Sequence, residues 1–119
     1  ALIKELDFKL EKKAFEIAMQ YNLIGGYSGD YGAAIKSFNN MLLEFPGSTL
    51  RSEVFYYRFD SAYKLAILSV DYLKEKRLKD ALAYYNALEK AYPNSEHMED
   101  ARIQKQELEQ ELNTFTTKS

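Results

Sequence analysis

The chain has 119 residues, of which 46 % are hydrophobic, and this length and composition fit one folded domain with its own core. Its formal charge of −2 gives no electrostatic reason to bind nucleic acid or an anionic membrane surface. The sequence holds no cysteine, which excludes disulfides, zinc–thiolate sites and thiol chemistry.

The first element is a helix, and a glycine-rich segment follows it. Apolar residues at steps of three and four predict a helix over 3–24, and residues 25–32 then read GGYSGDYG. A phosphate-binding loop needs a strand before it and usually ends in Gly-Lys-Ser/Thr, and this segment has neither. We therefore interpret it as a lengthened turn between paired helices, with Asp30 capping the second helix, and predict no nucleotide site.

The second and third helices are separated by a proline. Helical spacing over 31–45 ends at Pro46, because a proline disfavours the helical conformation of the residue before it. Ser48 is then a candidate N-cap, and the third helix is predicted to run without a break over 49–75.

The third helix carries the segment FYYRF, residues 55–59, which places aromatic side chains around most of its circumference. Such a helix must be covered on more than one side, either by the domain's own helices or by a partner. Two neighbouring helices should not cover this much aromatic area, so we predict an exposed apolar patch that binds a partner. The patch residues are Phe55, Tyr56, Tyr57 and Phe59.

The fourth and fifth helices, predicted over 78–92 and 95–113, complete an internal repeat. The segment YGAAIKSFNNMLLEFPGS (31–48) matches LKDALAYYNALEKAYPNS (78–95) at a constant offset of 47 positions, including Pro-x-Ser at the end of each. Repetition at such a period indicates stacked helical units.

The spacing within each unit resembles the tetratricopeptide repeat, in which small residues let two helices cross closely. Here Ala18 is expected to pack on Ala34, and Ser69 on Ala81. The predicted fold is therefore all-α: a single domain over 1–119, with two tetratricopeptide-like hairpins, the second with an extended first helix, and a C-terminal capping helix. In such repeats the first helix of each hairpin lines a concave groove.

Register places a mostly apolar row of residues in that groove, and its Phe, Met and Tyr side chains suit an extended peptide or a helix as ligand. The row is Lys12, Phe15, Met19 and Leu23 from the first unit, and Tyr63, Ala66, Val70 and Leu73 from the second. An alternative remains open at this point, because the last helix can fill the groove instead.

The sequence offers little for catalysis. His97 is the only histidine and is expected to be a solvated first-turn residue, and no second histidine or cysteine can join it in a metal site. Ser69 is expected to pack rather than to act as a nucleophile. We therefore predict no enzyme, no catalytic, cofactor-binding or metal-binding residue, and no cofactor.

Beyond the generic repeat, the chain resembles the C-terminal part of BamD-like lipoproteins of the outer-membrane β-barrel assembly machinery, in versions from Bacteroides-like bacteria. The resembling segments are KLEKKAFEIAMQY (9–21), DYGAAIKSFNNMLLEFPGS (30–48) and AYKLAILSVDYLKEKRLKDALAYYNALEKAYPNS (62–95). The resemblance to this family rests most specifically on Ser69, Arg77 and a long insertion before Tyr63, which together are more specific than the repeat pattern.

The resemblance implies a non-catalytic scaffold on the periplasmic face of the outer membrane, held there by an N-terminal lipid anchor absent from this chain. Its implied partners are the periplasmic domains of a BamA-like protein and other lipoproteins of the machinery. Arg77 could pair with a partner carboxylate, or locally with Asp80 or Glu75. The first residue, Ala1, leads us to expect a piece of a longer lipoprotein. The alternatives are another periplasmic repeat adaptor, for example in envelope constriction, and an accessory domain of an envelope enzyme.

Overall fold

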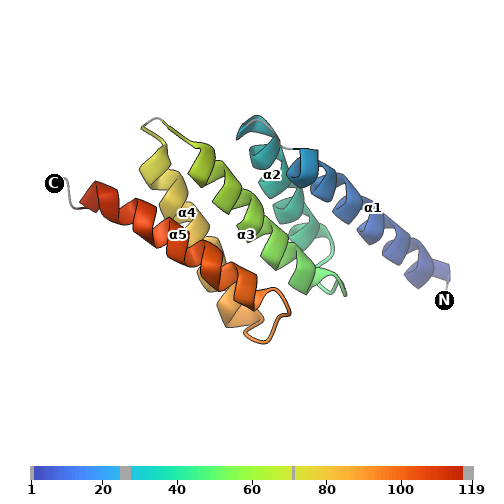
Figure 1. Cartoon of the computed structure of the whole chain (residues 1–119). Coiled ribbons are helices and arrows are strands. Elements are labelled where there is room, and N and C mark those ends of the chain that lie inside the picture. Colours follow the sequence, from blue (N-terminus) through green and yellow to red (C-terminus); the bar gives the residue numbers. More distant parts are fainter. Residues whose placement is uncertain (1, 25–27, 71, 117–119) are drawn as a thin grey trace.

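The computed structural model describes residues 2–24, 28–70 and 72–116, and this part of the chain is helical with no strand. The all-α prediction is thereby confirmed. Figure 1 shows the helices in chain order. They are α1 (Leu2–Ile24), α2 (Ser28–Glu44), α3 (Arg51–Leu68), α4 (Lys74–Ala91) and α5 (Met98–Thr116).

The helices form two layers. In Figure 1, α1, α3 and α5 lie side by side in the nearer layer, and α2 and α4 lie behind them. Successive helices run antiparallel, so α1 with α2 and α3 with α4 form two hairpins, and α5 packs against both helices of the second hairpin. As a result α3 contacts α1, α2, α4 and α5 and is the central helix of the domain.

The third helix is shorter than predicted. We expected one helix over 49–75, but α3 ends at Leu68, because Ser69 takes an extended conformation with φ −69° and ψ 137°. Its hydroxyl donates to the backbone carbonyl of Leu65 at 2.8 Å, and Lys74 donates to a carbonyl in the last turn of α3. The next residue, Val70, is a weak helix former that is 94 % exposed, so no packing rewards another turn.

The turn between α1 and α2 also differs from expectation. The lengthened turn was predicted over 25–32, but α2 already begins at Ser28, and residues 25–27 lie outside the described part of the chain. Asp30 is therefore in the first turn of α2 rather than at its N-cap, where its charge still suits the positive end of the helix dipole.

The turn between α2 and α3 and the turn between α4 and α5 have the same geometry, so the repeat seen in the sequence is also present in the structure. The Ser48 hydroxyl accepts from the backbone N–H of Leu50 at 3.0 Å, and the Ser95 hydroxyl accepts from that of His97 at 3.1 Å. The helices begin three residues after each serine, so both serines stabilise the turn, and Ser48 is not the N-cap that we predicted. The starts of α3 and α5 are again 47 positions apart.

Small residues lie at the expected crossing of the first hairpin. Ala18 and Ala34 are both fully buried in one cluster, to which Phe38 and Met41 also belong. In the second hairpin Ala81 is fully buried, in one cluster with Ala62 and Ala66 of α3. Ser69, which we expected on α3 at this crossing, lies beyond the end of that helix.

Changing Ala34 to leucine is expected to lower the free energy of unfolding by about 1–3 kcal/mol, because the added atoms have no room at the α1–α2 crossing. Ala33, which is only partly buried on the same helix, provides the control, and its change to leucine should have a smaller effect. Urea denaturation of both variants measures the difference. Equal stabilities for the two variants would contradict a tight crossing at Ala34.

Candidate functional site

The aromatic segment of α3 is buried, so the predicted exposed patch is wrong. Phe55, Tyr56 and Phe59 are 8 %, 7 % and 0 % exposed, and Tyr57 is partly buried. The prediction assumed two neighbouring helices, whereas four pack around α3. Tyr85 of α4, for example, meets Phe59 edge to face with ring centroids 5.6 Å apart.

Helix α5 covers the part of the predicted groove that belongs to the second hairpin. The Tyr63 hydroxyl donates to Glu107 of α5 at 2.8 Å, and Ala66 is fully buried. Burial, followed by the hydrogen bond to Glu107, raises the pKa of Tyr63 to about 12. Val70 lies past the end of α3, so neither it nor Tyr63 lines an open groove.

The part that belongs to α1 remains open. Phe15 packs its ring against Phe38 of α2 and Tyr57 of α3, with centroids 6.1 and 6.3 Å apart. Met19 is half-buried, and Leu23 is 73 % exposed. We call this surface, a shallow hollow of about 370 Å³, the α1 groove. Its residues are Phe15, Glu16, Met19, Gln20 and Leu23.

A polar network beside the α1 groove ties together the three helices of its layer. Asp60, at the middle of α3, is a buried residue with 6 % of its surface exposed. Its carboxylate accepts from Asn22 of α1 at 3.0 Å and from Gln104 of α5 at 2.7 Å. Lys64 pairs with the same carboxylate at 2.9 Å, and Asn22 also donates to Ser61 at 2.7 Å. The network fixes the end of α1, where the groove lies, relative to α3 and α5.

Arg77 makes a local contact that the sequence did not predict. Its guanidinium donates to the Ser69 hydroxyl at 2.8 Å and so braces the turn between α3 and α4. The predicted local partners of Arg77 are paired with lysines instead. Asp80 binds Lys76 at 2.8 Å, and Glu75 binds Lys79 at 3.0 Å.

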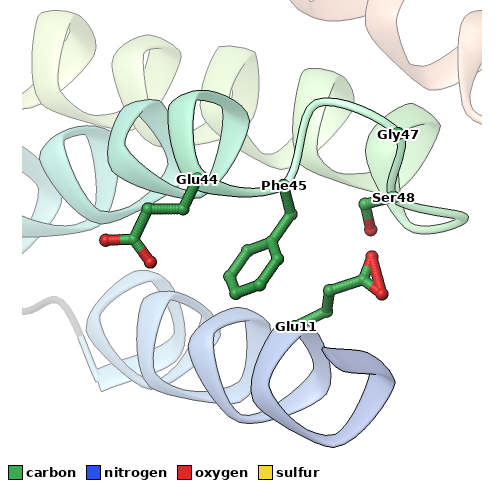
Figure 2. Close-up of a pocket in the computed structure, with 5 residues that line it drawn as sticks. All are labelled: Glu11, Glu44, Phe45, Gly47 and Ser48. Atoms are coloured by element: carbon green, nitrogen blue, oxygen red, sulfur yellow. The ribbon is translucent and has the colours of Figure 1, made fainter. Parts of the chain in front are cut away.

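A second hollow, of about 300 Å³, lies between the first half of α1 and the end of α2 (Figure 2). Phe45 points toward α1 in this view, with the carboxylates of Glu11 and Glu44 on either side. A similar hollow recurs 47 positions later, where Tyr92 and Ser95 replace Phe45 and Ser48. Because both turns produce it, the hollow follows from the repeat geometry and is not by itself a sign of function.

His97 is not the solvated residue that we expected. Its ring stacks on Tyr56 with centroids 4.3 Å apart and an interplanar angle of 9°, and its Nε2 lies 2.9 Å from Glu53. Only 18 % of its side chain is exposed. Sequence reasoning missed this contact because Glu53 lies 44 positions upstream, on α3, and no local spacing marks the pair.

Comparisons with protein families, curated proteins and solved structures gave no match to this chain. Within the described residues, no helix combines the length and apolar character needed to cross a membrane. The class of protein is therefore defined by the fold alone, as stacked α-helical hairpins with an open groove on the first helix.

Proposed function

We propose that the chain is a non-catalytic, protein-binding scaffold and that the α1 groove is its binding surface. The observation that carries this proposal is the contrast between the two hairpins. Helix α5 covers the inner face of the second hairpin, whereas Met19 and Leu23 on the first hairpin stay accessible.

The chemistry of the α1 groove favours a peptide or helix with apolar side chains. Phe15, Met19 and Leu23 are spaced four positions apart and form a row along one side of α1. The flexible methionine side chain adapts to varied apolar partners, and a row of this kind accepts an amphipathic helix or an extended segment. Glu16 at the edge of the row favours a partner with a basic residue near its apolar ones.

The more specific part of the proposal is a role in outer-membrane β-barrel assembly, as in BamD-like lipoproteins. Its support is the sequence resemblance over 9–21, 30–48 and 62–95, which spans parts of the first four helices. The partner would be the periplasmic domains of a BamA-like protein, at the periplasmic face of the outer membrane. The alternatives are another periplasmic repeat adaptor and an accessory domain of an envelope enzyme.

Changing Met19 or Leu23 to serine is expected to weaken binding to those periplasmic domains by about 1 kcal/mol or more, as for apolar anchors at an interface. Titration calorimetry with the domains from the same organism measures the affinity, and circular dichroism checks that each variant keeps its helices. Leu43→Ser is the matched control, because Leu43 is 82 % exposed on α2, in the other layer.

The possible outcomes separate the two levels of the proposal. Equal affinity for the wild type and all three folded variants would remove the α1 groove from the mechanism. If the wild type does not bind these domains, the assembly role fails. Capture of envelope proteins by the wild type but not by Met19→Ser would then still support a scaffold with a different partner.

A further inference from the structure

The geometry points to a binding site for a divalent transition-metal ion at Glu53, Glu96 and His97. The three side chains come from two places far apart in the sequence, the first turn of α3 and the turn between α4 and α5. Figure 1 shows these two places together at the lower edge of the domain. The site is separate from the α1 groove and is independent of the proposed scaffold function.

The distances between the potential ligand atoms are those that a metal ion can close. His97 Nε2 lies 2.9 Å from a Glu53 oxygen and 3.9 Å from a Glu96 oxygen, and all three atoms lie within 4.8 Å of one another. Zinc binds such ligands at about 2.0–2.2 Å, which places neighbouring tetrahedral ligands about 3.3–3.6 Å apart. The observed distances of 2.9 and 3.9 Å bracket that range, so small side-chain movements suffice.

Two of the three ligands are already held in place. The His97 ring stacks on Tyr56 and meets Tyr57 edge to face at 5.5 Å, and its backbone N–H binds Ser95. Glu53 is partly buried within a helical turn, with 33 % of its side chain exposed. An ion therefore meets a half-built site and has to order only the third side chain, Glu96, which is 81 % exposed.

The ligand types select the class of ion. One imidazole with two carboxylates suits zinc and its neighbours, whereas magnesium and calcium prefer oxygen ligands alone. Three protein ligands leave a fourth tetrahedral position for water. Binding would add a metal bridge between the start of α3 and the turn before α5, which ring packing and the contact between His97 and Glu53 already join, and so would stabilise the folded chain.

Titration calorimetry of Zn²⁺ into the metal-free full chain tests the site. We expect one ion per chain, a rise in the thermal midpoint with added Zn²⁺, and no comparable response to Mg²⁺. His97→Gln and Glu96→Gln should each weaken binding by about tenfold or more, since even residues that only orient metal ligands contribute about 10–100-fold. Glu99→Gln is the control, because Glu99 is an exposed acid in the first turn of α5, outside the site.

Glu96→Gln keeps the test valid if His97→Gln perturbs the packing around Tyr56, because Glu96 is mostly exposed and its loss should leave the fold intact. The proposal is overturned if the wild type shows no saturable Zn²⁺ binding, and the contact between His97 and Glu53 is then only a hydrogen bond. It is also overturned if Glu96→Gln binds Zn²⁺ as tightly as the wild type and the control Glu99→Gln do.

Discussion

Replacing Phe59 with alanine is expected to lower the free energy of unfolding by about 3–5 kcal/mol, the range for deleting a buried phenylalanine ring. Phe59 is fully buried at the centre of α3. Its ring contacts Tyr85 of α4 at a centroid distance of 5.6 Å, and Tyr56 and Tyr63 on its own helix at 6.4 and 6.5 Å. The cavity would open where α3 meets its neighbours, so no single helix can move to fill it. Such a loss is a large fraction of the about 5–15 kcal/mol that stabilises most domains.

Urea denaturation followed by circular dichroism measures this loss. Val70→Ala is the control, because Val70 is 94 % exposed and its truncation should change the stability by less than about 0.5 kcal/mol. If Phe59→Ala proved as mild as Val70→Ala, the packing of α4 against α3 would be looser than the structure shows. The result would also reopen the possibility that the aromatic segment of α3 serves a partner.

The parts of the fold that the sequence predicted are those governed by periodicity and by proline. Steps of three and four between apolar residues located α1, α2 and α4, and Pro46 and Pro93 marked the two turns within a residue or two. The offset of 47 positions carried over to the turn geometry at Ser48 and Ser95. These signals are local, so they do not depend on knowing which helices become neighbours.

The end of α3 could not be predicted in the same way. The segment after Leu68 keeps helical spacing through Tyr72, and nothing in the letters shows that Val70 and Tyr72 would be 94 % and 89 % exposed. A helix continues where packing rewards it, and that reward depends on the position of α4. The turn contact between Arg77 and Ser69 is likewise tertiary.

The burial of FYYRF was misjudged for the same reason. Arg58 lies within this segment, and its guanidinium stacks over Phe55 at 4.8 Å and over Tyr84 of α4 at 4.4 Å. It also donates to Asn39 of α2 at 3.0 Å. Burial lowers its pKa, and the two rings offset part of the cost of burying the charge. Arg58 thus bridges α2 and α4, the two helices of the other layer.

Of the candidate binding residues, Phe15 and Met19, which the repeat register placed on the first helix, line the open α1 groove. The polar network around Asp60 and the contact between His97 and Glu53 were not predicted. Each joins residues 38–44 positions apart, and their letters, Asn, Asp, Gln and Glu, are common on exposed helix faces. An alignment of related sequences would be needed to mark such pairs in advance.

Replacing Asp60 with alanine is expected to lower the free energy of unfolding by about 3 kcal/mol, although aspartate is a poor helix former in general. The change removes the acceptor of the Gln104 amide and one of the two acceptors of the Asn22 amide, which keeps Ser61, and Asn22 is only 2 % exposed. An unsatisfied buried polar group costs about 1–3 kcal/mol, and loss of the partly buried ion pair with Lys64 adds to it. Because the network holds the end of α1, hydrogen exchange in the last turns of α1 should also become faster.

The matched control is Asp80→Ala. Each of the two aspartates pairs with a lysine four positions away on its own helix. Asp80 pairs with Lys76 at 2.8 Å, and Asp60 pairs with Lys64 at 2.9 Å. The two pairs differ in burial, since the Asp80 side chain is 52 % exposed and that of Asp60 is 9 %. An exposed pair of this kind contributes about 0.3–0.5 kcal/mol, so Asp80→Ala should be nearly neutral. Similar losses of stability for the two variants, or unchanged exchange in α1 for Asp60→Ala, would show that the network does not position the α1 groove.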